Sequence, residues 1–196
     1  TAQDIDRSLK RMALQIMEDN RDVEQLGLVG IHTGGVYLAE RLRKIILAHE
    51  GLELPVGSLD ITLYRDDWSL ASQNPIVKTT SIPFDVKDAT LVLIDDVLYT
   101  GRTIRAALDA IMDLGRPRSI QLAVLINRGC GRELPIMPNY MGMDVLESIN
   151  EHIHVLLSEK DGEENKHAGF TIMSAKAWCM CKSLYNYTQE TKLCVT

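Results

Sequence analysis

The sequence predicts an α/β fold in which a mostly parallel central sheet is flanked by helices. Short apolar runs at residues 26–31, 91–94 and 120–126 have the length and the apolar character of buried strands. Between these runs, apolar residues recur at helical spacing in segments that end near Gly or Pro. Strands and helices that alternate in this way favour parallel pairing through crossover connections.

The overall composition is that of an ordinary globular protein with one domain. The chain has 196 residues, of which 45% are hydrophobic and 24% are charged, and this length suffices for one substantial core. A net charge of −6 makes a general nucleic-acid-binding protein an unfavoured interpretation, because such binding depends on an excess of Lys and Arg. No apolar run approaches the roughly 18 residues that cross a bilayer, and the amino end is polar. We therefore expect a cytoplasmic protein.

The cysteines have the spacing neither of a disulfide framework nor of a zinc site. They are Cys130, Cys179, Cys181 and Cys194. One residue separates Cys179 from Cys181, whereas zinc ligands are typically separated by two to four. We expect free thiols.

The amino-terminal part predicts a helix, a strand and a second helix. Apolar residues at helical spacing, with charged residues between them, predict an amphipathic helix over residues 4–20. The apolar run 26–31 predicts a strand that opens into the small-residue turn 32–35. Helical spacing then resumes and stops at Gly51, a residue type common at helix C-termini.

The next strand is predicted from alternation and is followed by a polar excursion. Leu59, Ile61 and Leu63 alternate with polar residues, which predicts a strand that leads into Arg65. Residues 68–83 are polar and contain two prolines, so we expect a loop or hairpin of the kind from which lids are built.

The strand 91–94 ends at two consecutive carboxylates, Asp95 and Asp96. Helical spacing over 104–114 predicts a helix, and the run 120–126 predicts another buried strand. After this strand the pattern weakens.

The carboxyl-terminal part carries weaker signals. Residues 138–142 are rich in turn formers, 152–157 form a candidate strand, and 159–166 are hydrophilic. Residues 170–173 form a candidate last strand. The remaining tail has no pattern that we can assign.

The segment after the strand 91–94 has the parts of a sugar-phosphate site. Ligands bind at the carboxyl edge of an open α/β sheet. There Gly101 allows close approach of the backbone, and the hydroxyls of Thr100 and Thr103 can donate to phosphate oxygens. Asp95 and Asp96 would repel phosphate but can accept hydrogen bonds from a ribose diol. Taken alone, the two acids could equally be a solvated strand end followed by a helix cap.

The spacing of these residues favours the sugar-phosphate site over a solvated strand end. Two aspartates followed by Thr-Gly-x-Thr after a four-residue apolar strand closely resemble the signature for 5-phosphoribosyl diphosphate (PRPP) of the type I phosphoribosyltransferases. The resemblance covers about residues 4–164 and includes 61–67, 115–125 and 132–136. It implies the type I phosphoribosyltransferase fold, with a small hood and a flexible loop.

The resemblance also implies an activity. Within the family, the chain is most similar to members that act on uracil and regulate pyrimidine genes. This implies transfer of the phosphoribosyl group from PRPP to uracil, giving UMP and diphosphate. Magnesium would accompany PRPP, held largely by the substrate and water, with Asp95 and Asp96 as candidate protein ligands.

Individual roles follow from the same resemblance. The catalytic carboxylates Asp95 and Asp96 would hold the ribose hydroxyls. The residues that would bind the 5-phosphate are Val97, Leu98, Tyr99, Thr100, Gly101, Arg102 and Thr103. Thr33 and Gly34 match the loop that holds the diphosphate. Arg65 is placed either to meet the charge of the diphosphate or to form an ordinary surface ion pair.

The chain departs from the family pattern in two loops. The diphosphate loop usually reads Lys-Thr-Arg-Gly, whereas this chain has His32-Thr-Gly-Gly35 and lacks both cations. Charge-assisted hydrogen bonds contribute about 1.5–3 kcal/mol each, so we expect weaker activity. The loop 128–132 is one residue longer than usual and carries Cys130 where the family has histidine. The reaction needs no covalent step, so we interpret Cys130 as a loop residue.

Other functions stay open at this level. The chain could be a UMP-sensing regulator that binds pyrimidine-operon messenger RNA in transcription attenuation, with or without catalysis. It could also be a purine or orotate phosphoribosyltransferase, or a PRPP-binding domain without activity; the match at 132–136 favours uracil. Basic residues that could gather on one face for RNA are Arg7, Lys10, Arg11, Arg41, Arg43, Lys44, Arg116 and Arg118. The net acidity speaks against this.

We expect one phosphoribosyltransferase domain over residues 1–165. Residues 166–196 would add the candidate last strand and the unassigned tail. The family implies a homo-oligomer, a dimer or higher, but the sequence shows no interface stripe distinct from the core.

Overall fold

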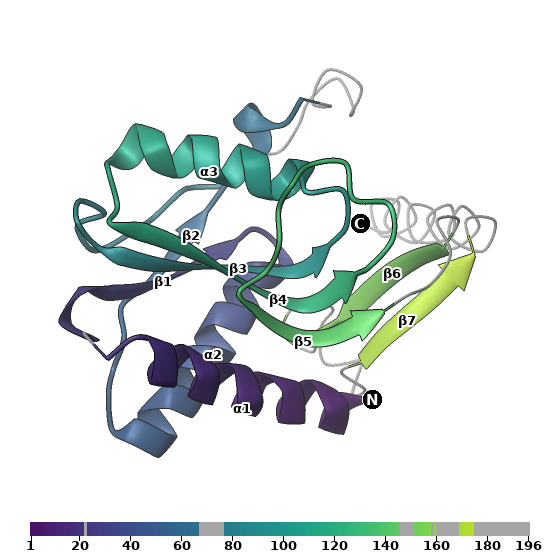
Figure 1. Cartoon of the computed structure of the whole chain (residues 1–196), viewed down its shortest axis with the longest axis horizontal. Coiled ribbons are helices and arrows are strands. Elements are labelled where there is room, and N and C mark those ends of the chain that lie inside the picture. The colour runs from purple at the N-terminus through teal and green to yellow at the C-terminus, as the bar shows by residue number, and fades with distance from the viewer. Residues whose placement is uncertain (22, 67–76, 146–150, 158, 160–168, 175–196) are drawn as a thin grey trace, which may run out of the picture.

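The computed structural model describes residues 1–21, 23–66, 77–145, 151–157, 159 and 169–174. Five parallel strands form one sheet in the order β2-β1-β3-β4-β5 (Figure 1). Their bounds are Leu26–Ile31 for β1, Val56–Leu59 for β2, Thr90–Leu98 for β3, Ser119–Arg128 for β4 and Tyr140–Val145 for β5. The predicted α/β class and parallel sheet are confirmed.

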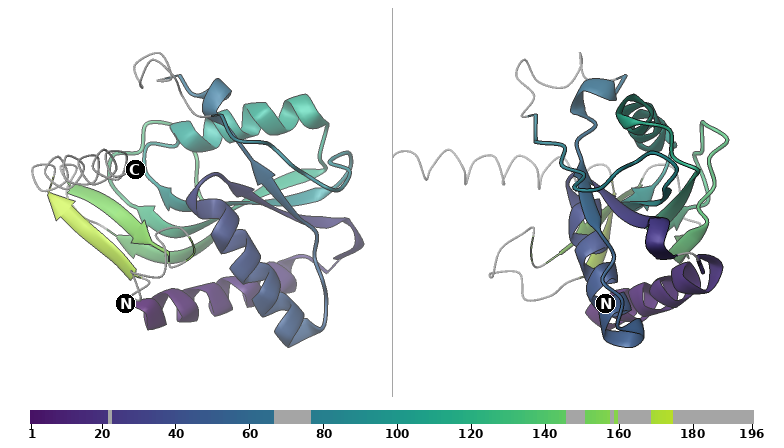
Figure 2. Two further views of the ribbon diagram at one scale, coloured as in Figure 1. Left: turned by 180° about the vertical axis from the view of Figure 1, so that it is seen from behind. Right: turned by 90° about the vertical axis from the view of Figure 1, so that its left-hand side faces the viewer.

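Helices cover both faces of this sheet. They are α1 (Ala2–Asp19), α2 (Gly34–Glu50) and α3 (Arg102–Leu114). Helices α1 and α2 lie against one face, and α3 lies against the other (Figures 1 and 2). Because neighbouring residues of a strand point to opposite faces, Val92 packs in the core beneath α1 and α2, whereas Leu93 packs in the core beneath α3.

A buried cluster of hydrogen-bonded polar side chains connects the end of α1 to the sheet. The Asn20 side chain donates to the Tyr140 hydroxyl at 3.2 Å, and that hydroxyl donates to Gln121 Oε1 at 3.1 Å. Asn20 and Gln121 also exchange two hydrogen bonds of 2.9 Å. Burial raises the pKa of Tyr140 to about 12.

Two further strands form a separate antiparallel pair. They are β6 (Glu151–Leu156) and β7 (Gly169–Ser174). The pair lies beyond the carboxyl ends of β3, β4 and β5 (Figure 1). The predicted strands at 152–157 and 170–173 are confirmed, whereas the tail from residue 175 lies outside the described residues. The division of the chain at residue 165 stays a prediction.

Most predicted elements agree with the structure. The helices expected over 4–20 and 104–114 and the strands expected at 26–31 and 120–126 are present. Helix α2 ends at Glu50 and is capped by Gly51, whose φ of 68° is the left-handed conformation that favours glycine. No helix among the described residues is long and apolar enough to cross a membrane.

The strand predicted over Leu59–Leu63 is wrong. Strand β2 ends at Leu59, and Thr62–Tyr64 form a short 3-10 helix, η2; another one, η1, covers Val23–Gln25. The turn forms because the Asp60 carboxylate accepts hydrogen bonds from the backbone N–H and the hydroxyl of Thr62, at 3.0 and 2.6 Å. Leu63 is consequently 68% exposed.

Two other boundaries differ from the prediction. Strand β3 does not stop at Asp95 but continues to Leu98. Strand β5 was missed because residues 138–142 resemble a turn. Gly142 is instead a buried strand residue, and a Cβ there would collide with the Leu125 carbonyl of β4. Of the predicted excursion 68–83, residues 68–76 lie outside the described residues, and Ser81 bridges to Ser58.

Candidate active site

The sheet order places a topological switch point between the carboxyl ends of β1 and β3. The chain leaves β1 through α2 toward β2 at one side and leaves β3 through α3 toward β4 at the other. In doubly wound sheets, ligands bind where the connections diverge in this way. Gly30 is paired with Ile94, so the turn that follows β1 lies beside Asp95 and Asp96.

The two aspartates occupy different environments. Asp95 is only 6% exposed, and its Oδ1 accepts a hydrogen bond of 2.9 Å from the Asp96 N–H. Burial, and secondarily the charge of Asp96, raises the pKa of Asp95 well above its usual range, whereas the charge of Arg65 opposes this. Asp96 is half-buried. Asp96 is therefore the more accessible carboxylate of the pair.

Glycines bring the turn after β1 into close contact with β3. A Cβ on Gly34 would collide with the carboxylate of Asp96, and a Cβ on Gly35 would collide with the Ile94 carbonyl. The peptide bond between His32 and Thr33 is cis, and Thr33 makes no side-chain capping bond with α2. Of the predicted diphosphate residues, the structure thus places Gly34 directly beside Asp96, and Thr33 is the residue before it.

The predicted phosphate segment divides into a strand and a turn. Val97 and Leu98 belong to β3, and the Leu98 side chain is buried in the core beneath α3. Tyr99 and Thr100 form the turn, and Gly101 precedes α3 with a φ of 95°, which favours glycine. We refer to Tyr99–Thr103 as the phosphate-binding turn, after the role that the sequence predicts for it.

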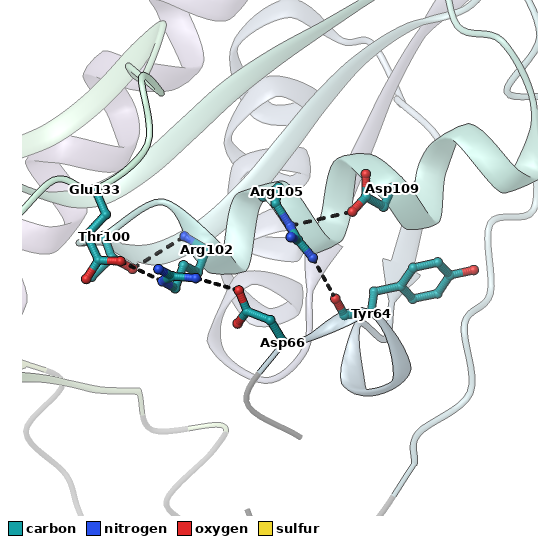
Figure 3. A network of polar contacts seen from close by, with 7 residues as sticks. All are labelled: Tyr64, Asp66, Thr100, Arg102, Arg105, Asp109 and Glu133. Atoms are coloured by element: carbon teal, nitrogen blue, oxygen red, sulfur yellow. Dashed lines mark hydrogen bonds and ion pairs between the residues drawn. The ribbon is translucent and has the colours of Figure 1, made fainter. Parts of the chain in front are cut away.

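The side chain of Arg102 is engaged by two carboxylates (Figure 3). Its guanidinium contacts Asp66 and Glu133, each at 2.6 Å. Its backbone N–H lies 3.4 Å from the Thr100 hydroxyl oxygen. The Arg102 guanidinium is therefore paired within the protein.

One turn further along α3, Arg105 joins this helix to η2. Its guanidinium donates to the Tyr64 carbonyl at 3.4 Å and contacts Asp109 at 3.6 Å (Figure 3). Tyr64 immediately precedes Arg65, which is exposed and close enough to Asp95 to affect its pKa. The structure therefore brings Arg65 to the same edge as the aspartates.

Sequence reasoning missed the residues that support the turn. Arg132 donates to the Tyr99 carbonyl at 2.7 Å, and the Thr100 carbonyl accepts from the N–H groups of Glu133 and Leu134. In the sequence, the motif at 132–136 points only to the family resemblance and to uracil. A contact between a side chain and a distant backbone carbonyl leaves no signal in spacing.

The longer loop 128–132 packs around the ring of Tyr99. The Arg128 guanidinium lies 4.0 Å from the ring centroid, a cation–π contact. Gly131, with a φ of 78°, lies on the same ring, and a Cβ there would collide with it. Cys130 is half-buried in this loop.

Of the eight basic residues considered for RNA binding, three lie on α1, three on α2 (Lys44 among them) and two between α3 and β4. Arg41 is paired with Glu159 at 2.6 Å, and Arg43 with Glu40 and Glu53 at 2.9 and 2.7 Å. Three others lie on the exposed side of α1, namely Arg7, Lys10 and Arg11. Arg116 and Arg118 lie in the connection from α3 to β4, at the opposite edge of the sheet from the aspartates.

Comparisons with known proteins agree with this architecture. A family described as phosphoribosyl transferase domain matches residues 1–161. A protein named bifunctional protein PyrR from Syntrophobacter fumaroxidans is 52% identical over 161 residues, covering 82% of this chain and 86% of that protein. One of the same name from Thermoanaerobacter sp. is 57% identical over 157 residues, covering 80% and 88%.

Solved structures show the same fold. The hypoxanthine phosphoribosyl transferase of Trypanosoma cruzi superposes with a TM-score of 0.69 over 93% of each chain, at 14% sequence identity. This similarity concerns the fold alone.

Proposed function

Because this chain belongs to the phosphoribosyltransferase family, and within it to the proteins named bifunctional PyrR, we propose that it transfers the phosphoribosyl group of PRPP to uracil. The products are UMP and diphosphate. The observation that carries the proposal is the position of Asp95 and Asp96, which lie between the phosphate-binding turn and the turn at Thr33 and Gly34.

In the proposed reaction the bond between ribose C1 and the diphosphate oxygen breaks with its electron pair leaving on diphosphate. Positive charge develops on the ribose ring, and uracil N1 forms the new bond to C1 as its proton is released. Asp95 and Asp96 accept hydrogen bonds from the ribose hydroxyls and place negative charge near the sugar. Such preorganised charge lowers the barrier without an acid–base step at the ribose.

The phosphate-binding turn holds the 5-phosphate in this proposal. Helix α3 starts at Arg102, and its first N–H groups have no partner within the helix. The positive end of the helix dipole adds to their attraction for an anion. Gly101 lets the backbone approach closely, and Thr100 and Thr103 add hydroxyl donors.

The diphosphate faces Thr33, Gly34 and Arg65. The accessible carboxylate of Asp96 fits a magnesium ion, which prefers oxygen ligands. Among the described residues no three His, Cys, Asp or Glu side chains converge on one point, so such an ion would take its other ligands from diphosphate and water. When bound, it would neutralise charge that builds up on the leaving diphosphate.

A base panel tests the proposed activity. The protein is incubated with PRPP and magnesium in the presence of uracil, hypoxanthine, guanine or orotate, and nucleotide formation is followed. We expect UMP from uracil and no nucleotide from the other bases. Turnover of a purine base or of orotate instead of uracil would show that uracil is the wrong substrate.

A second candidate function is UMP-sensing regulation of pyrimidine genes through messenger RNA. The relatives are named bifunctional, and α1 presents exposed Arg7 and Lys10. Contacts of such residues with phosphates make RNA affinity fall with salt. Binding of a pyrimidine-operon leader RNA that strengthens with UMP and weakens with salt would support this function, which we place in the cytoplasm.

Sedimentation of the same samples would give the oligomeric state of the protein, for which we propose a dimer or higher.

A further inference from the structure

The segment Arg132–Leu134 holds the backbone of the phosphate-binding turn from behind. Arg132 Nη1 donates to the Tyr99 carbonyl at 2.7 Å. The N–H groups of Glu133 and Leu134 both donate to the Thr100 carbonyl, at 3.0 and 3.1 Å. Two consecutive carbonyl groups of the turn are therefore directed at one segment.

These contacts fix the direction of the N–H groups as well. The C=O and N–H groups of a trans peptide unit point in opposite directions. Across the described residues the cis peptide bond is the one between His32 and Thr33, so both units of the turn are trans. The N–H groups of Thr100 and Gly101 consequently point away from Arg132–Leu134. They are free to serve as donors to an anion on the other side of the turn.

Arg132 is itself held in place through two strands. Its Nη2 donates to Asn127 Oδ1 at 2.6 Å, and Asn127 Nδ2 donates to Asp144 Oδ1 at 2.8 Å. Asn127 belongs to β4 and is 7% exposed, whereas Asp144 belongs to β5. Because its NH2 group is bound by Asp144, the amide of Asn127 presents its oxygen to Arg132. The planar guanidinium can reach this oxygen and the Tyr99 carbonyl together.

We propose that Arg132 is a positioning residue for PRPP. It directs the N–H of Thr100 toward the 5-phosphate without touching the substrate, because its two terminal nitrogens are bound to the Tyr99 carbonyl and to Asn127. This inference rests on the proposed function and deepens it. It assigns part of the affinity for the 5-phosphate to a residue outside the segment that contacts the phosphate.

The variants Arg132→Lys and Asn127→Ala separate positioning from direct binding. Lysine keeps the positive charge but lacks the fork that reaches two acceptors. Alanine at 127 removes the support of Arg132 and leaves the arginine intact. Arg43→Gln is a matched control, since Arg43 is 27% exposed and paired with Glu40 and Glu53 away from the aspartates.

The readouts are kcat and KM for PRPP in UMP formation, and the Kd of UMP measured by calorimetry. For Arg132→Lys we expect KM and Kd to rise about tenfold or more, the effect of one or two charge-assisted hydrogen bonds. Asn127→Ala should also raise KM for PRPP and the Kd of UMP, by a smaller factor. At saturating PRPP, kcat should stay within about threefold, because the reacting atoms are untouched. Arg43→Gln should match the wild type.

Three results would overturn the inference. Unchanged KM and Kd beside a lower melting temperature would make Arg132 a structural residue only. Weakened binding in Arg132→Lys with unchanged binding in Asn127→Ala would make it a direct ligand. A wild-type protein that binds neither PRPP nor UMP would remove both the proposed function and this role. If the wild type binds UMP but turns over no base, the proposed catalysis is wrong and the positioning role of Arg132 is still tested by the Kd of UMP.

Discussion

The carboxylate of Asp96 occupies the space into which any side chain on Gly34 would project. Gly34 is the first residue of α2, and Asp96 lies near the end of β3. The contact therefore joins the proposed diphosphate turn to the proposed ribose site, and each half limits what the other can accommodate.

Substitution of Gly34 by alanine should disturb the site more than the fold. The added Cβ must displace the Asp96 side chain, so we expect kcat/KM for uracil and PRPP to fall about tenfold or more, with little change in melting temperature. Gly51→Ala is the opposite control. It has open space around it but a left-handed φ, so it should cost about 1 kcal/mol in stability and leave kcat/KM unchanged. Equal kinetics for wild type and Gly34→Ala would contradict the proposed role of this contact.

Substitution of Asp95 by asparagine should stabilise the protein while it abolishes turnover. The raised pKa of Asp95 means that between pH 3.8 and that raised value the folded protein binds more protons than the unfolded one. The Asp95 carboxyl thus contributes to the free energy of unfolding at low pH, and this contribution is lost as the pH rises. Asparagine stays neutral and can still accept the Asp96 N–H.

Thermal melts of wild type and Asp95→Asn between pH 4 and pH 8 check this expectation. The variant should melt at a higher temperature at pH 8, with an advantage that shrinks toward pH 4. An advantage that grows on acidification would mean that Asp95 is stabilised in its charged form.

Replacement of His32 by lysine should strengthen PRPP binding. The turn lacks the two cations of the usual family loop, and one charge-assisted hydrogen bond to diphosphate would lower KM for PRPP by about tenfold. Initial rates at varied PRPP give this KM. His49→Lys makes the same substitution at an exposed position in the last turn of α2 and should change nothing. A similar KM for His32→Lys and wild type would show that position 32 does not face the diphosphate.

Substitution of Tyr140 by phenylalanine should affect stability alone. The hydroxyl exchanges hydrogen bonds with Asn20 and Gln121 far from the aspartates, so we expect a loss of about 1 kcal/mol in urea unfolding with unchanged kcat. Since burial raises the pKa of Tyr140 to about 12, its contribution is complete below pH 10 and declines between pH 10 and 12. The difference between wild type and variant should narrow over that range, and a constant difference would refute the assignment.

The parts of the fold that local spacing controls could be predicted from the sequence. Helix α3 and strand β4 have apolar faces with the periods of a helix and a buried strand, and the predicted bounds lie within two residues of the observed ones. Strand β5 was missed because its close packing against β4 requires Gly142, which in a single sequence resembles a turn residue. The end of β2 was misplaced because the side chain of Asp60 diverts the backbone.

The candidate site shows the same limit. Asp95, Thr100 and Gly101 stand together in one segment, so their position at the sheet edge followed from the strand that precedes them. The contacts of Arg132 with Tyr99 and of Gly34 with Asp96 join residues that are distant in the chain. Such pairs depend on strand order and register, which no local pattern reveals.

Formation of UMP from uracil and PRPP by the wild type, beside Asp95→Asn/Asp96→Asn, is the most direct test of the central claim. We predict turnover by the wild type and none by the double variant, with both proteins folded. Undiminished turnover by the double variant would contradict the assignment of this site, and no turnover by the wild type, with PRPP and UMP still bound, would contradict the proposed catalysis.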